Sequence, residues 1–104
     1  MGRLQDVDMK IMCYYNKNLK MSNGKIAAQV GHVCRKSGVY SQVTENQEIV
    51  NTSDDVIIVL GLRQNKFNEK LQQIKDEMYD VFIQKDLGFT EVEKNTITAF
   101  GYIK

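Results

Sequence analysis

The first part of the chain shows one strand pattern followed by one helix pattern. Residues 10–15 form a short apolar and aromatic run that ends at the polar stretch 16–18, as expected of a strand. Capping side chains at 22–24 precede a segment, residues 25 to about 37, in which apolar residues share one helical face: Ile26, Val30 and Val33. Small residues beside this face predict that a second backbone approaches the helix closely there: Ala27, Ala28 and Gly31.

The second half of the chain continues the alternation of strands and helices. The run 55–62 is almost wholly apolar and β-branched, which indicates a strand covered on both faces and makes it the expected central strand. Residues 65–79 predict a helix with an apolar face made of Phe67, Leu71, Ile74 and Met78. Residues 80–84 and 96–103 predict two more strands. The connection between them is too short for a crossover, so the last strand should run antiparallel to the one before it.

This order of elements predicts an α/β protein with three layers, α/β/α, around a four-stranded mixed sheet whose last strand is antiparallel. A chain of 104 residues fits a single domain, with residues 1–8 as a loose extension. Segment 39–53 is polar and ambiguous, and a short helix around 43–50 is one interpretation. The longest apolar run has seven residues, against the roughly 20 that cross a bilayer. We therefore expect a cytoplasmic protein without a membrane span.

Charge is distributed unevenly along the chain. Residues 1–36 carry seven basic and two acidic side chains, a net charge of +5, whereas the remainder has seven basic and eleven acidic ones, a net charge of −4. A basic amino-terminal part can face a phosphate backbone, although ordinary scatter of solvated charges explains the same counts equally well. Cys13 and Cys34 lack metal-type or redox-type spacing, and we interpret both as reduced structural thiols. The chain has a single histidine, which argues against a conventional zinc site, since catalytic zinc usually takes about three protein ligands.

Two motifs occur in order along the chain. The first covers residues 16–32 and contains Asn16-Lys17-Asn18-Leu19-Lys20-Met21, then Gly24-Lys25-Ile26-Ala27-Ala28-Gln29-Val30-Gly31-His32. The second is Asp86-Leu87-Gly88-Phe89-Thr90, followed by Thr96-Ile97-Thr98. Together they resemble the type II peptidyl-tRNA hydrolase family, in which an Arg-x-Asp-Leu-x-Met stretch precedes Gly-Lys-x-Ala-Ala-Gln-x-x-His, and Asp-x-Gly-x-Thr precedes Thr-x-Thr. The resemblance extends from about Met9 to the carboxyl end.

The resemblance implies hydrolysis of the ester that joins a peptide to the 3′-terminal ribose of a tRNA, with peptidyl-tRNA as the partner and no metal or organic cofactor. It assigns a catalytic site to four residues: Lys25, Asp86, Thr90 and Thr98. It places three more beside the substrate: Lys20, Gln29 and His32. It also leaves open a homodimer.

Each charged residue of this implied site has a role that its chemistry suits. Lys25 would meet an oxyanion or a phosphate at the amino end of a helix, where the helix dipole is positive. Asp86 would orient or deprotonate a water molecule or a threonine hydroxyl. His32 is a lone helical histidine, which is more often structural, so we assign it no catalytic step.

The chain also departs from the family pattern. Asn16 and Asn18 stand where the family has Arg and Asp, and Leu87 and Phe89 would make the pocket mouth more apolar. Family members continue beyond the position of Lys104 through a Gly-Pro segment and a helical piece, so we expect the shorter end to lower activity and any dimerisation. These departures support an alternative: a weak or inactive member that serves as an RNA- or protein-binding module.

Overall fold

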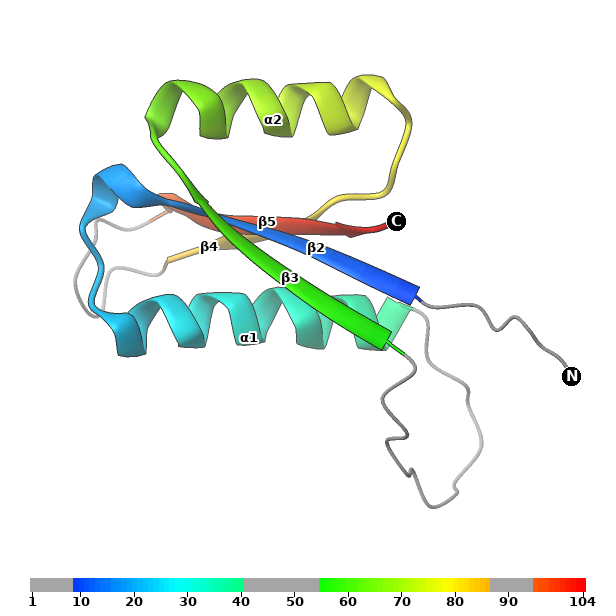
Figure 1. Cartoon of the computed structure of the whole chain (residues 1–104), viewed down its shortest axis with the longest axis horizontal. Helices are drawn as coiled ribbons and strands as arrows, with labels where there is room; N and C mark the ends of the chain where they lie inside the picture. Colours follow the sequence, from blue (N-terminus) through cyan, green and yellow to red (C-terminus); the bar gives the residue numbers. More distant parts are fainter. Residues whose placement is uncertain (1–8, 41–54, 87–94) are drawn as a thin grey trace, which may run out of the picture.

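The computed structural model describes residues 9–40, 55–86 and 95–104. Within them, four strands form one sheet in the order β3-β2-β5-β4 (Figure 1), with these bounds: β2 Met9–Asn16, β3 Asp55–Leu62, β4 Phe82–Lys85 and β5 Ile97–Ile103. Two helices accompany the sheet, α1 (Asn23–Tyr40) and α2 (Gln64–Asp76), and a short 3-10 helix, η1 (Lys17–Leu19), follows β2. The expected helix around 43–50 and the expected extension 1–8 lie outside the described residues. No helix in the described ranges is both long and apolar enough to cross a membrane.

The two helices lie on opposite faces of the sheet (Figure 1). Helix α1 packs on β2, β5 and β4, whereas α2 packs on β2 and β3. Strand β2 is parallel to β3 and antiparallel to β5, and β5 is antiparallel to β4. The predicted three-layer α/β/α architecture, with a mixed sheet and an antiparallel last strand, is therefore confirmed.

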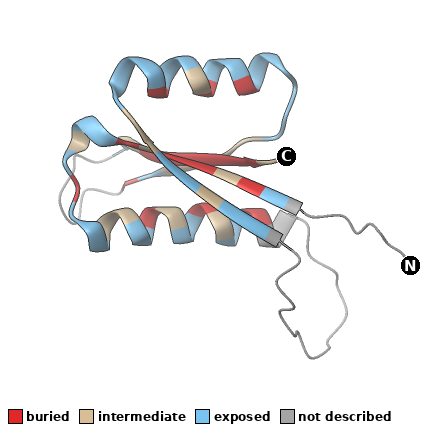
Figure 2. Ribbon diagram, viewed as in Figure 1, coloured by how far each residue is buried: buried red, intermediate tan, exposed pale blue. Residues whose placement is uncertain are grey.

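A separate apolar layer lies under each helix, and Figure 2 marks buried positions on both helices and on the strands between them. The layer under α2 is largely aromatic and contains Tyr14, Phe67, Leu71, Ile74, Phe100 and Tyr102. Burial, followed by the neighbouring Tyr102 hydroxyl, raises the pKa of Tyr14 to about 12, so this phenol stays neutral in the core. The layer under α1 is smaller and contains Ile11, Cys13, Val33 and Ala99. Alternation along β2 sends its side chains to the two layers in turn.

Strand β3 lies at an edge of the sheet, so the prediction that it is the central strand is wrong. Four of its side chains are exposed: Val56, Ile57, Val59 and Leu60. The central positions belong to β2 and β5; α1 packs on both strands, and side chains of α2 meet Tyr14 of β2 and Phe100 of β5 in one apolar layer. An apolar run indicates a strand, but the order of strands depends on how the whole chain connects and packs, which a single segment cannot report.

Helix α1 can lie close to the sheet because of a glycine on strand β5, and not because of the small residues on the helix itself. Gly31 is exposed, and a Cβ at this position would meet nothing within 4 Å. Ala27 and Ala28 are exposed as well, so the prediction that these small residues admit a second backbone is wrong. Instead, a Cβ at Gly101 on β5 would lie 2.7 Å from Cγ1 of Val33. The absence of a side chain at Gly101 therefore lets the buried Val33 reach the sheet.

Helix α2 ends earlier than its apolar periodicity predicts. Phe67, Leu71 and Ile74 are buried as expected, but the helix stops at Asp76 and Met78 is 88% exposed, so its predicted place in the core is wrong. The amide of Tyr79 donates to the carbonyl of Ile74 and that of Met78 to the carbonyl of Lys75. These two bonds form a Schellman motif, whose left-handed position is occupied by Met78 with φ 69°.

Replacing Met78 by glycine should stabilise the protein. The left-handed conformation costs a residue with a Cβ about 1 kcal/mol or more, and the exposed Met78 side chain offers little packing in return. We expect Met78→Gly to raise the free energy of unfolding in urea by about 1 kcal/mol. Glu77→Gly is the matched control, since Glu77 has φ −81° and glycine there should destabilise. A loss of stability in both variants would contradict this interpretation.

Candidate active site

One edge of the molecule collects the ends of three strands and the starts of both helices, on the left in Figure 1. Because β2, β3 and β4 run in the same direction, their carboxyl ends meet there. Helix α1 follows β2 through η1, and α2 begins directly after β3. We call residues 16–25, 62–66, 85–86 and 95–98 the carboxyl edge. Ligands of α/β sheets usually bind at such an edge.

Lys25 and Asp86 form an ion pair at the carboxyl edge. Lys25 lies in the first turn of α1, where its backbone N–H donates to Oγ of Ser22, 3.2 Å away. Its Nζ donates to Oδ1 of Asp86, and the two side chains are only 11% and 6% exposed. Asp86 directly follows β4, and its backbone N–H donates to the carbonyl of Thr96 at 2.9 Å. Two charges from distant parts of the sequence are thus held together, almost out of water.

A neutral polar pair lies on the same side of the sheet. Oγ1 of Thr98 donates a hydrogen bond to Oε1 of Gln29 at 2.6 Å, and both residues are buried. Gln29 lies one turn of α1 after Lys25, so α1 supplies one partner to each pair. Because Thr98 occupies Oε1 of Gln29, the amide N–H groups of Gln29 are the donors that can face another acceptor.

A register shift in the sheet turns Thr98 toward α1. Phe100 and Tyr102 on β5 point into the layer under α2, and strict alternation would send Thr98 there too. However, Gln84 pairs with Ala99 and Lys85 with Ile97, so β5 has one extra residue, Thr98, opposite β4. This irregularity has the form of a β-bulge, which re-aims a side chain near a site.

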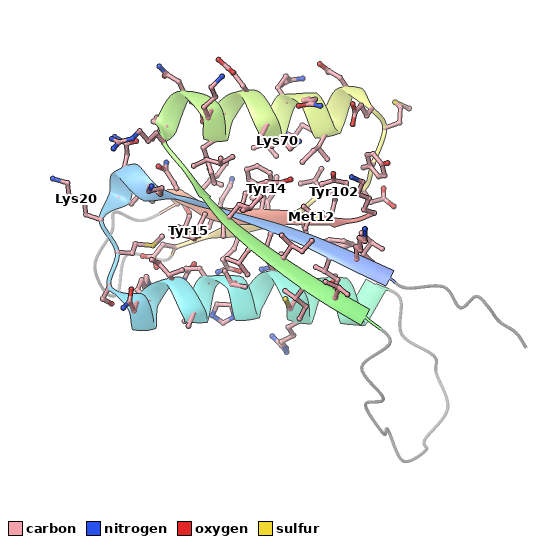
Figure 3. All side chains as sticks on the ribbon, in the orientation of Figure 1. Met12, Tyr14, Tyr15, Lys20, Lys70 and Tyr102 are labelled. Carbon is pink, nitrogen blue, oxygen red and sulfur yellow. The ribbon has the colours of Figure 1, made fainter. Side chains whose placement is uncertain are left out.

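The fold brings some of the sequence-predicted site residues together and leaves others exposed or outside the described residues. Lys25 and Asp86 contact each other, and Thr98 contacts Gln29. Thr90 lies outside the described residues, as do Leu87 and Phe89. His32 is exposed on α1, although Gln29 one turn earlier is buried. Lys20 is exposed, in a left-handed conformation with φ 54°, and Figure 3 shows its side chain pointing away from the body of the protein.

Asn16 and Asn18 form a network that the motif pattern does not reveal. Nδ2 of Asn16 donates to Oε1 of Gln64 at 2.8 Å, while its Oδ1 accepts from the backbone N–H of Asn18 at 2.9 Å. Oδ1 of Asn18 accepts from the backbone N–H of Gln64 at 2.7 Å and so caps the first turn of α2. These two departures from the family pattern therefore tie the β2–α1 connection to α2 without any charge.

The carboxyl edge is basic. It contains six cationic side chains, Lys17, Lys20, Lys25, Arg63, Lys66 and Lys85, and its acidic residue is Asp86. The amino ends of two helices add positive dipole ends to this edge. Such a concentration of positive charge favours an anionic ligand.

Comparison with known proteins adds a family to this geometry. Residues 9–103 match the family model described as Peptidyl-tRNA hydrolase PTH2. The chain is 27% identical over 101 residues to a peptidyl-tRNA hydrolase of Staphylothermus marinus, covering 94% of this chain and 84% of that protein. It is 30% identical over 95 residues to one of Thermoplasma acidophilum, covering 88% of this chain and 81% of that protein. A Caenorhabditis elegans protein named "Probable peptidyl-tRNA hydrolase 2" is 30% identical over 111 residues; the match covers 97% of this chain but 34% of the relative.

Proposed function

This chain belongs to the peptidyl-tRNA hydrolase PTH2 family, whose model it matches over residues 9–103, and on that premise we propose that it hydrolyses the ester bond between peptide and tRNA in peptidyl-tRNA. The observation that carries the proposal is the nearly buried Lys25–Asp86 ion pair at the basic carboxyl edge. The proposal places the chain in the cytoplasm, where its substrate arises.

The ion pair supplies the two charges that ester hydrolysis needs. In the proposed reaction, Asp86 accepts a proton from a water molecule as the water oxygen attacks the ester carbonyl carbon. The carbonyl oxygen becomes an oxyanion, which the Lys25 ammonium and the amino end of α1 stabilise. The tetrahedral intermediate then collapses, the bond to the ribose oxygen breaks, and the proton on Asp86 passes to that oxygen.

The neutral pair has a positioning part in this proposal. Thr98 holds Gln29 through Oε1, and in the proposed reaction an amide N–H of Gln29 would donate to the substrate carbonyl or to the attacking water. Thr90 belongs to the same proposal through the family motif alone. Lys17, Lys20, Arg63 and Lys66 would contact the phosphates of the tRNA, because charge that lies around a site steers and holds a polyanion.

Release of a blocked amino acid from N-acetyl-aminoacyl-tRNA tests the proposal. The purified chain should release it faster than the buffer alone, and Asp86→Asn should be slower by about 10²-fold or more, since it removes the proton acceptor at nearly constant size. Asp76→Asn, at the exposed last position of α2, is the matched control and should keep full activity.

Circular dichroism of each variant detects a folding defect. This control is needed because Asp86→Asn removes the carboxylate that pairs with the nearly buried Lys25 charge, which can destabilise the fold. Absence of release by the wild-type chain would refute the proposal and favour a binding module. Equal rates in Asp86→Asn and the wild type would show that the ion pair is structural.

A further inference from the structure

Two cysteines that are far apart in the sequence touch beneath α1. Cys13 on β2 is fully buried and Cys34 on α1 is half-buried, and their Sγ atoms are 3.9 Å apart. Both are free thiols in the structure. From the sequence, both are interpreted as reduced structural thiols, because they are 21 positions apart and have neither redox-type nor metal-type spacing. The fold makes them a pair.

The two sulfur atoms are in contact, and a glycine lies beside one of them. A separation of 3.9 Å is van der Waals contact, and a disulfide bond of about 2.05 Å needs the sulfur atoms to approach by about 2 Å. The residue that pairs with Cys13 on β5 is Gly101, which has no side chain to lie beside the sulfur atoms. Cys34 lies in the fourth turn of α1, beside the apolar layer that contains Cys13.

We propose that Cys13 and Cys34 form a redox-sensitive pair, which a small-molecule disulfide such as oxidised glutathione converts into an intramolecular disulfide that ties α1 to β2. Cys34 is the more exposed thiol, and its thiolate attacks one sulfur of the oxidised glutathione. The glutathione S–S bond breaks, one glutathione thiolate leaves, and Cys34 carries a mixed disulfide. Cys13 then loses its proton to solvent, and its thiolate attacks Sγ of Cys34 and releases the second glutathione. Two protein thiols are oxidised, and one glutathione disulfide is reduced to two glutathione molecules.

The environment of Cys13 makes the second step slow. Burial, and then the neighbouring Cys34, raise the pKa of Cys13 to about 12, so its thiolate is scarce near neutral pH. The pair therefore stays reduced during brief oxidation and closes under sustained oxidising conditions. The slow step is intramolecular, and the sulfur that Cys13 attacks is already in contact with it. This proximity partly offsets the scarcity of the Cys13 thiolate.

Closing the pair would also affect the proposed site, and this part rests on the proposed function. The same helix carries Lys25 and Gln29, which contact Asp86 after β4 and Thr98 on β5. Drawing Cys34 toward β2 shifts α1 relative to both of these contacts. We therefore expect the disulfide form to hydrolyse peptidyl-tRNA at least several-fold more slowly, with recovery after reduction.

Intact-mass measurement of the folded full chain after incubation with oxidised glutathione tests the pair. The wild type should lose the mass of two hydrogen atoms and retain no glutathione. Its Tm should rise by about 10 °C, because the crosslink restricts the unfolded chain, and dithiothreitol should reverse both changes. Cys34→Ser should stay at its reduced mass, whereas Cys13→Ala should keep one glutathione on Cys34.

Other outcomes overturn the proposal. A wild-type chain that stays at its reduced mass while folded, or that keeps glutathione on Cys34, would show that the sulfur atoms do not close. A disulfide form with undiminished hydrolysis would refute the effect on the site. If the disulfide forms and raises Tm but neither form hydrolyses peptidyl-tRNA, the thiol pair stands and the proposed function fails.

Discussion

Lys25→Ala should lower the rate of peptidyl-tRNA hydrolysis a few hundredfold or more, whereas Lys20→Ala should mainly weaken substrate binding. Lys25 lies against Asp86 in the first turn of α1, so its loss removes the proposed oxyanion partner, which typically costs about 3 to 4 kcal/mol in the transition state. Lys20 is exposed in the connection before the helix, where under the proposed function it would contact an RNA phosphate.

Steady-state kinetics at several salt concentrations separates the two lysines. Lys25→Ala should lower kcat, while Lys20→Ala should raise KM and reduce the slope of log affinity against log salt by about one. Lys75→Ala, in the last turn of α2 and away from the carboxyl edge, should change neither. Equal and mild defects in the Lys25 and Lys20 variants, with unchanged circular dichroism, would show that the nearly buried Lys25 ammonium takes no part in the reaction.

Gly101→Ala should strongly destabilise the fold. An added Cβ would lie 2.7 Å from the carbonyl oxygen of Met12 and 2.7 Å from Cγ1 of Val33. The Met12 carbonyl belongs to the central strand β2, so it cannot move without disturbing the ladder between β2 and β5. Overpacking of this kind costs about 1 to 3 kcal/mol, and the upper end is expected where backbone must shift.

Gly61→Ala is the matched comparison in chemical denaturation. Its added Cβ would also be crowded, at 2.6 Å from Cζ of Tyr15 and 2.7 Å from Cγ of Lys17, but both atoms belong to side chains that can turn away. In addition, Gly61 lies on the edge strand β3. We therefore expect a clearly smaller loss in the free energy of unfolding. Equal losses in the free energy of unfolding for the two variants would contradict this explanation, because crowding against the β2 backbone would then cost no more than crowding against side chains that can move.

The local elements of this protein could be predicted from the sequence. Apolar spacing indicated both helices and the four strands close to their observed bounds, and the short connection before β5 indicated its antiparallel direction. Phe67, Leu71 and Ile74 were identified as buried for the same reason. Helical and strand periodicity depend on neighbours within a few residues, so a single segment carries that information.

The candidate site was predictable only in part. The family motifs indicated Lys25 and Asp86, and the position of Asp86 after a strand suggested an edge where ligands bind. That these two charges pair with each other, 61 residues apart, is a property of the folded chain. The direction of Thr98 depends on a register shift between β4 and β5, which strict alternation does not predict.

Only the tertiary structure decided the order of the strands in the sheet, the place where α1 comes close to the sheet, and which side chains from distant parts of the sequence meet. The apolar run of β3 looks central but lies at an edge, and the helix approaches the sheet over Gly101 and not through its own small residues. Cys13 and Cys34 became a pair in the same way. Each of these features depends on which segments pack together, and that choice is made by the free energy of the whole chain, because burial and strand pairing join residues that have no covalent proximity.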